Sequence, residues 1–148
     1  MAGKRVVILG STGSIGDTTF RVLGSLGEDF RVVGMSAGHQ LEQLVRRARS
    51  CEPEAVCIAD EAQVESVRRQ LPGVRVLSGP EGLAQLAALD EADVVVNGLV
   101  GAVGLLPTLE ALKAGKVGFD GITGTCFNTS VFYCLCRAAP KIDVCASV

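Results

Sequence analysis

Short apolar segments alternate with helical patterns over most of this chain, and this alternation limits the folds that are available to it. The ranges with strand character are 5–9, 30–36, 55–59, 74–78 and 93–100. Between them, apolar residues recur at spacings of three and four, which is the pattern of a helix with one buried face. Strands joined by helices form a parallel sheet covered on both faces, with right-handed crossovers. We therefore expect a single α/β domain built on a doubly wound parallel sheet.

A glycine-rich turn, in the segment VVILGSTGSIG, follows the first strand. In such turns the first glycine (Gly10) permits a tight bend, the second (Gly13) lets a phosphate approach the backbone, and the third (Gly16) lets the helix pack on the strand. Backbone N–H groups at the start of the helix, with the hydroxyls of Thr12 and Ser14, would bind an anion. This strand–turn–helix context predicts nucleotide binding in a Rossmann-like domain. The alternative is a turn that needs its glycines for structure alone.

The end of the second strand indicates which dinucleotide binds. Domains that hold NAD often carry an Asp or Glu about 20 residues beyond the glycine turn, where it accepts a hydrogen bond from the ribose. This chain has no carboxylate there, and Ser36, His39 and Gln40 could donate hydrogen bonds to the 2′-phosphate of NADP(H). We therefore expect NADPH to bind in preference to NADH. The alternative is that these polar residues only begin a helix.

A polar residue, Asn97, ends the fifth strand and is followed by a glycine-rich loop. Loops at the carboxyl ends of parallel strands face the ligand crevice. We therefore place Asn97 near the nicotinamide end of the cofactor. A structural turn explains the same residue equally well.

Composition argues against several other classes of protein. The net charge of −2 gives no basic surface for nucleic acid, and we expect the cluster Arg46, Arg47 and Arg49 to form a solvated helix face. No segment approaches the roughly 20 apolar residues of a membrane span. The N-terminus has no recognisable signal peptide. We expect a cytoplasmic protein with reduced thiols that binds neither nucleic acid nor membrane.

The sequence pattern changes near residue 117. The segment 117–148 holds four of the six cysteines and four of the six aromatic residues, and the alternation of strands and helices cannot be followed into it. We therefore divide the chain into a cofactor-binding domain at 1–116 and an atypical tail at 117–148. The tail is interpreted as partly disordered, as a buried apolar strand, or as an out-of-frame product. A zinc site is a weaker alternative, because the spacing of the cysteines is unusual for one. These cysteines are Cys126, Cys134, Cys136 and Cys145.

Several longer motifs together resemble one enzyme family. The segments GSTGSIG, VVGMSAG, PEAV, GPEGL and VVNGLVGAVGLLPTLEALKAGK, in this order, resemble the N-terminal part of 1-deoxy-D-xylulose 5-phosphate reductoisomerase over residues 4–116. The resemblance implies the NADPH-binding domain of an enzyme of the non-mevalonate isoprenoid pathway. Such an enzyme isomerises its sugar phosphate substrate and reduces the product to 2-C-methyl-D-erythritol 4-phosphate. It needs Mg²⁺ or Mn²⁺ and is typically a homodimer.

The resemblance also assigns cofactor contacts to this chain. The family's phosphate loop falls on Thr12, Gly13, Ser14 and Ile15, and its 2′-phosphate region falls on Gly38, His39 and Gln40. The family usually has Lys or Arg at the position of His39 and Asn at that of Gln40. A neutral imidazole pairs less well with a phosphate than a permanent cation does. Asp17 stands where a neutral residue is expected, and its carboxylate would repel a pyrophosphate if it faced the loop.

The family's later motifs are not recognisable after Lys116. They are an Asn-Lys-Glu motif, the acidic metal ligands, a flexible loop and a helical domain. Only Asp120 and Asp143 remain as carboxylates, so we expect no catalytic residue, no metal ligand and no turnover by this chain alone. One alternative is an NADP enzyme of the semialdehyde dehydrogenase type, which would need a histidine beyond His39. Another is a non-catalytic nucleotide-binding or redox module whose tail is the working part.

Overall fold

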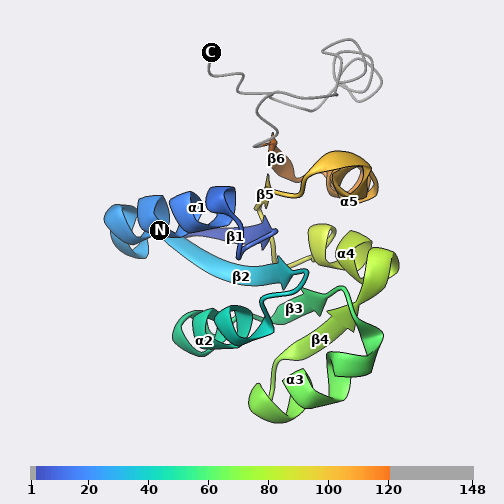
Figure 1. Cartoon of the computed structure of the whole chain (residues 1–148). Helices are drawn as coiled ribbons and strands as arrows, with labels where there is room; N and C mark the ends of the chain where they lie inside the picture. Colours follow the sequence, from blue (N-terminus) through green and yellow to red (C-terminus); the bar gives the residue numbers. More distant parts are fainter. Residues whose placement is uncertain (1–2, 121–148) are drawn as a thin grey trace.

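A computed structural model describes residues 3–120, and every described strand belongs to one parallel sheet. The strands are β1 (Lys4–Leu9), β2 (Phe30–Ala37), β3 (Ala55–Ile58), β4 (Arg75–Ser78), β5 (Val94–Asn97) and β6 (Val117–Asp120). Their order across the sheet is β4-β3-β2-β1-β5-β6 (Figure 1). The predicted α/β fold with a doubly wound, Rossmann-like parallel sheet is confirmed.

The strand order determines on which face of the sheet each helix lies. The chain moves outward from β1 to β4 and then returns to β5 and β6. Right-handed crossovers therefore place the first three helices on one face and the last two on the other, as Figure 1 shows. The helices are α1 (Ser14–Leu26), α2 (Leu41–Cys51), α3 (Val64–Gln70), α4 (Gly79–Ala87) and α5 (Leu105–Lys113), with short 3₁₀ helices η1 (Gly27–Asp29), η2 (Glu61–Gln63) and η3 (Gly101–Gly104). Within residues 3–120, no helix is both long and apolar enough to cross a membrane.

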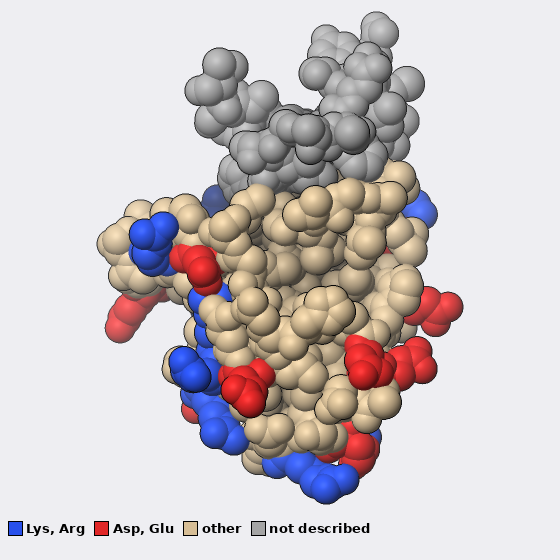
Figure 2. Space-filling view, in the orientation of Figure 1, with Lys and Arg blue, Asp and Glu red and all other residues tan. Residues whose placement is uncertain are grey.

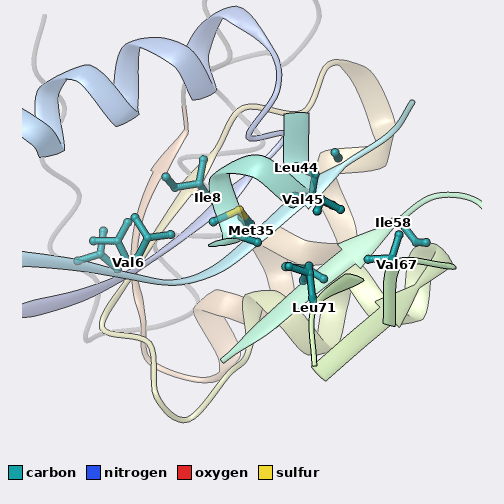
Figure 3. Packing of buried hydrophobic residues seen from close by; sticks show 13 residues of the cluster. Val6, Ile8, Met35, Leu44, Val45, Ile58, Val67 and Leu71 are labelled. Carbon is teal, nitrogen blue, oxygen red and sulfur yellow. The ribbon is translucent and has the colours of Figure 1, made fainter. Parts of the chain in front are cut away.

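Two hydrophobic cores lie on the two faces of the sheet, and β1 contributes to both. Val6, Ile8 and Met35 lie in a cluster with residues of α2 and α3 (Figure 3), and Phe20 and Leu23 of α1 pack against it. Val7 and Leu9 point to the opposite face, where they pack against α4 and α5. Successive side chains of a strand point to opposite faces, so a central strand covered on both sides has apolar residues throughout. This burial explains the uninterrupted apolar run before the glycine turn.

The sixth strand extends the sheet beyond the boundary that we expected at residue 116. In β6, Val117 pairs with Val94 and Asp120 pairs with Asn97 of β5. The strand is only four residues long and contains a glycine, so its sequence carries no clear alternation. The described sheet therefore extends to residue 120. The four cysteines of the expected tail lie outside the described residues.

An ion pair joins the start of β1 to the residue before β5, at the amino ends of these strands and opposite the glycine turn. The Asp93 carboxylate accepts hydrogen bonds from the Arg5 backbone N–H (2.8 Å) and from its guanidinium (2.8 and 3.1 Å). The Asp93 N–H in turn donates to the Arg5 carbonyl (2.8 Å). The hydrogen bonds from Arg5 lower the pKa of Asp93 from 3.8 to about 2. The pair therefore stabilises the fold above pH 4, and this contribution is lost as the pH falls towards 2.

Two glycines outside the turn are expected to respond oppositely to alanine. A Cβ on Gly34 would lie 2.9 Å from Leu86 Cδ1 and 3.0 Å from Val7 Cγ2 in the packed core, whereas a Cβ on Gly24 in α1 would meet no atom within 4 Å. Gly34→Ala should lower the free energy of unfolding by about 1 kcal/mol or more through overpacking. Gly24→Ala should raise it by about 0.5–1 kcal/mol, because alanine favours the helix. Urea denaturation of both variants measures the two effects, and a stabilising Gly34→Ala would contradict this packing.

Candidate functional site

The candidate site lies where β1 and β5 end side by side. Leu9, the last residue of β1, pairs with Asn97, the last residue of β5. The chain leaves β1 towards α1 on one face and leaves β5 towards α5 on the other. Such a divergence of two neighbouring strands opens a crevice at the carboxyl edge of a parallel sheet. The glycine turn and the loop after β5 both begin at this point.

The three glycines of the turn have three different environments. Gly10 has a φ of +72°, and a Cβ there would lie 2.9 Å from the Gly98 carbonyl oxygen, so this position needs glycine for both its conformation and its space. A Cβ on Gly16 would overlap the Ser11 carbonyl group. Gly13 differs, because the only neighbour within 4 Å of its Cβ position is the Gly10 carbonyl oxygen at 3.6 Å. The tight bend at Gly10 and the close packing at Gly16 agree with the expected roles, and Gly13 faces open space.

Ser36 at the end of β2 holds the first two residues of the turn. The Gly10 N–H donates to Ser36 Oγ (2.9 Å), and both the N–H and the hydroxyl of Ser11 donate to the Ser36 carbonyl oxygen (2.7 and 2.8 Å). Ser11 is fully buried, and Ser36 is only 2% exposed. We expected Ser36 to donate to a 2′-phosphate, and that interpretation is wrong because its hydroxyl lies inside the fold. Its function is to position the glycine turn.

The N–H groups that follow in the turn remain available to a ligand. Residues 3–120 provide no acceptor for the N–H groups of Thr12, Ser14, Ile15 or Gly16, and no side chain from this part of the chain caps the N-terminus of α1. Gly13 and Ser14 are exposed. Unpaired N–H groups at a helix N-terminus, together with the helix dipole, bind anions. The arrangement therefore suits a phosphate group.

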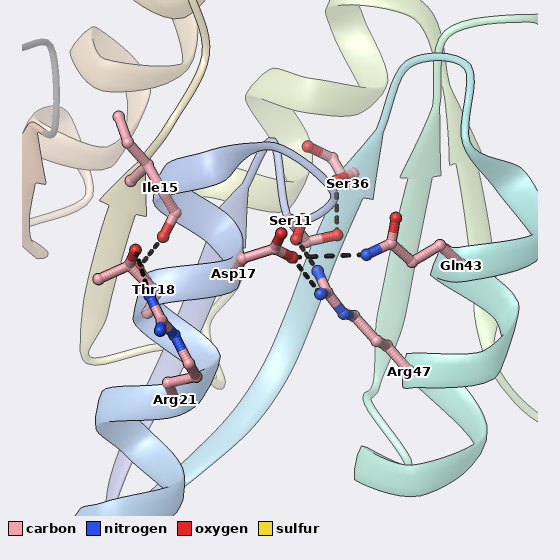
Figure 4. Close-up of polar contacts among 9 residues, drawn as sticks. Ser11, Ile15, Asp17, Thr18, Arg21, Ser36, Gln43 and Arg47 are labelled. Atoms are coloured by element: carbon pink, nitrogen blue, oxygen red, sulfur yellow. Dashed lines mark hydrogen bonds and ion pairs between the residues drawn. The ribbon is translucent and has the colours of Figure 1, made fainter.

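The acidic residue beside the turn is paired with an arginine. Asp17 accepts hydrogen bonds from the Arg47 guanidinium and from Gln43 Nε2 (3.4 Å), both from α2 (Figure 4). Arg47 also donates to the Ser11 carbonyl oxygen. Its side chain is only 20% exposed, so Arg47 does not belong to the solvated helix face that we predicted. Arg46 and Arg49 are exposed as expected.

A groove begins at the end of β2, where Gly38, His39 and Gln40 are all exposed. It has a volume of about 870 Å³ and lies between α2, η2 and α3, with these three residues at its start. Arg46 and Asp60 also line it. Figure 2 shows Lys and Arg side chains gathered on the α2 and α3 side of the molecule. The structure therefore brings the three residues of the expected 2′-phosphate region together beside a polar groove.

The side chain of Asn97 is used within the protein. It is 3% exposed, and its Nδ2 donates to the Gly104 carbonyl oxygen (3.1 Å) and to Thr108 Oγ1 (2.8 Å). Its Oδ1 accepts from the Leu99 N–H (3.0 Å). These contacts connect the end of β5 to η3 and the start of α5. Of our two interpretations the structure favours the structural turn, because the amide has no group left to present to a cofactor.

The described residues contain neither a metal centre nor a reactive cysteine. Within residues 3–120, no three His, Cys, Asp or Glu side chains cluster as metal ligands do. Burial raises the pKa of the Cys51 thiol and raises that of Cys57 to about 12, so neither thiol is activated at neutral pH. The geometry of this part of the chain supports anion binding, and no metal chemistry can be derived from it.

Comparison with known proteins points to one family. The sequence model of 1-deoxy-D-xylulose 5-phosphate reductoisomerase matches residues 6–117. Among relatives with that name, the protein of Cyanothece sp. is 40% identical over 102 residues, which are 66% of this chain and 26% of the relative. That of Thermosynechococcus vestitus is 43% identical over 102 residues, which are 66% of this chain and 25% of the relative. The chain thus spans about a quarter of the length of these relatives.

Solved structures agree with the sequence relatives. A crystal structure of DOX-P reductoisomerase in complex with NADPH, fosmidomycin and magnesium is 30% identical and superimposes with a TM-score of 0.74, over 78% of this chain and 29% of that one. The enzyme of Zymomonas mobilis in complex with NADPH has a TM-score of 0.80 at 22% identity, over 95% of this chain and 38% of that one, and shows the shared fold. These matches decide against a semialdehyde dehydrogenase.

The role of Asn97 can be tested by removing its amide. Asn97→Ala leaves the Leu99 N–H without its acceptor and removes the donor to Thr108 Oγ1 and to the Gly104 carbonyl oxygen, so the free energy of unfolding should fall by about 1–3 kcal/mol. Urea denaturation measures the change, and Gln63→Ala, which removes an exposed amide, serves as the matched control. A loss of dinucleotide affinity with unchanged stability would instead place Asn97 in the cofactor site.

Proposed function

The chain belongs to the 1-deoxy-D-xylulose 5-phosphate reductoisomerase family, and from this premise we propose that it provides the NADPH-binding domain of such an enzyme. The observation that carries the proposal is the open glycine turn at the divergence of β1 and β5. Its N–H groups at 12 and 14–16 have no acceptor within residues 3–120, and Gly13 leaves the approach to them free. We keep 1–116 as the proposed cofactor domain, with β6 completing its sheet.

The pyrophosphate of NADPH is proposed to bind at the glycine turn. Thr12, Ser14 and Ile15 supply open backbone N–H groups, Gly13 leaves the space for the phosphate to approach them, and the hydroxyls of Thr12 and Ser14 add donors. The positive end of the α1 dipole lies at the same place and favours the two negative charges. Gly10 belongs to this proposal as the residue that shapes the turn. None of these contacts needs a movement of the buried Ser36.

The 2′-phosphate is proposed to bind at the start of the groove. Gly38, His39 and Gln40 follow β2 directly, and all three are exposed. The imidazole and the amide can donate hydrogen bonds to the phosphate oxygens. Arg46 lines the same groove and adds a permanent positive charge, beside the carboxylates of Glu42 and Asp60. Since NADH lacks this phosphate, these residues support a preference for NADPH.

The chemistry of the family divides between this domain and the rest of a complete enzyme. Bound NADPH supplies a hydride, and the residues of this domain bind and orient the cofactor. The loop after β5 starts beside the glycine turn, since the Gly98 N–H donates to the Leu9 carbonyl oxygen (2.8 Å), and we place the nicotinamide end there. Residues 3–120 contain no ligand cluster for Mg²⁺ or Mn²⁺, so substrate binding and isomerisation are proposed for the complete enzyme. Homodimer assembly, which the resemblance implies, and a cytoplasmic location, which was expected from the sequence, are likewise proposals.

Gly13 provides the first test of the cofactor site. Gly13→Val fills the approach to the N–H groups, so the Kd of NADPH should rise at least about tenfold. Because the backbone at Gly13 has a φ of −88° and its Cβ position is open, the Tm should change little. Fluorescence titration and thermal unfolding measure the two quantities, with Gly24→Val as the control on the exposed side of α1. Unchanged NADPH affinity in a folded Gly13→Val variant would refute the placement of the pyrophosphate.

His39 provides a test of cofactor preference. The wild-type chain should bind NADPH more tightly than NADH. His39→Arg adds a permanent cation at the proposed 2′-phosphate position and should lower the Kd of NADPH about three- to tenfold, with little change for NADH. Ser25→Arg adds the same charge in the last turn of α1 and should leave the ratio of the two Kd values unchanged. Equal tightening for both cofactors in His39→Arg would argue against a 2′-phosphate contact.

A further inference from the structure

A carboxylate in the first turn of α1 conflicts with an anion site at the start of the same helix. The Asp17 N–H donates to the Gly13 carbonyl oxygen (2.9 Å), so Asp17 lies one helical turn beyond Gly13 and directly follows the open N–H groups at 14–16. A carboxylate here stabilises the helix through its dipole. It also opposes the binding of a pyrophosphate at the same helix end, because like charges repel over several ångströms even near water. The site therefore needs a countercharge.

Arg47 of α2 supplies that countercharge. Its guanidinium donates to the Asp17 carboxylate and also to the Ser11 carbonyl oxygen (Figure 4). It lies over the ring of Phe20, with its central carbon 4.7 Å from the ring centroid. The side chain of Arg47 is 20% exposed, whereas that of Asp17 is 51% exposed. The Arg47 guanidinium is thus fixed by three contacts. The more exposed Asp17 side chain can adjust its position to pair with it.

The two hydrogen bonds of Arg47 act on the two groups that would disturb an anion at the turn. One directs the Asp17 carboxylate towards α2, where Gln43 Nε2 also reaches it at 3.4 Å. The other engages the Ser11 carbonyl, whose negative end would otherwise be free in the middle of the turn. Together the Arg47 and Asp17 side chains carry no net charge. The N–H groups of the turn then act on a ligand without opposition from a nearby acid.

We propose that Arg47 is a positioning residue for dinucleotide binding, which acts through Asp17 and Ser11 and does not touch the cofactor. This proposal rests on the proposed function and adds a residue whose role differs from those at the two phosphates. The pyrophosphate is common to NADPH and NADH, so loss of Arg47 weakens the binding of both cofactors by a similar factor. Changes at His39 act on NADPH alone, and the two effects are therefore separable.

The test combines changes of charge at both partners in the full 148-residue chain. Arg47→Gln removes the charge but keeps an amide that can donate to the Ser11 carbonyl, and it should raise the Kd of NADPH and NADH about five- to tenfold. Adding Asp17→Asn to this variant restores the balance of charge and should return both Kd values to within about threefold of the wild type. The deficit of Arg47→Gln should shrink in high salt, because it arises from charge repulsion. Arg49→Gln, which removes an exposed charge from the same helix, is the matched control and should bind as the wild type does.

Each outcome of this test supports or overturns the proposal. A wild-type chain that binds neither cofactor overturns both this proposal and the proposed function, whereas wild-type affinity in Arg47→Gln overturns this proposal alone. A loss for NADPH only, which Asp17→Asn does not reverse, would show that Arg47 contacts the 2′-phosphate itself. If Arg47→Gln does not fold, the variant that combines it with Asp17→Asn provides the test. A rise of about tenfold or more in its Kd values contradicts a role of Arg47 through Asp17. Thermal unfolding of every variant separates binding from stability.

Discussion

The hydrogen bonds that converge on Ser36 are the constraint on which the rest of the site depends. They engage the N–H groups of Gly10 and Ser11 and the Ser11 hydroxyl, and both Ser11 and Ser36 are buried. A buried polar group that loses its hydrogen-bond partner cannot pair with water instead, which costs free energy. These hydrogen bonds therefore fix the position of the start of the turn. The N–H groups left without an acceptor in the described residues are those of Thr12 and of the first residues of α1. Because Ser36 is also the last but one residue of β2, it holds the start of the 38–40 segment at a fixed place relative to the turn.

The consequence for the proposed cofactor is that its two phosphate regions are positioned by the same strand end. The glycine turn follows β1 and the 38–40 segment follows β2. Both are positioned by the buried Ser36, which accepts hydrogen bonds from the turn and lies two residues before Gly38. An extended ligand that spans them therefore meets a prearranged pair of sites and loses little free energy in ordering the protein. The charge balance around the turn also depends on two separate elements, because Asp17 in α1 pairs with Arg47 in α2.

The fold could be predicted from the sequence because its main elements are periodic over several residues. The run before Gly10 is apolar because β1 is buried on both faces, and burial of that kind is visible in composition alone. The strand β6 was missed because four residues, one of them Gly118, carry too little pattern. Gly10 and Gly16 were recognised for a related reason, since a positive φ or a tight contact demands glycine and no other residue type.

The polar residues of the site were harder to assign, because their partners come from distant parts of the chain. Ser36 lies 25 residues from Ser11, Arg47 lies 30 residues from Asp17, and nothing in the local sequence shows that either pair meets. Asn97 has its partners nearby, but its spacing allows a buried turn as well as an exposed ligand contact. A polar side chain is equally compatible with the interior and the surface until the packing around it is known.

Helix α1 packs on the sheet through partly buried side chains. Phe20 and Leu23 pack against the core. Gly16 is the only buried residue of the helix within the described part of the chain, and Val22 and Leu26 are half exposed. The N–H groups proposed for phosphate binding thus belong to an element whose apolar side chains are only partly covered. Local opening of such an element costs less free energy than unfolding of the sheet. We therefore expect the amides of α1 to be less protected from hydrogen exchange than those of the strands, and an anion bound at its first turn to add to their protection.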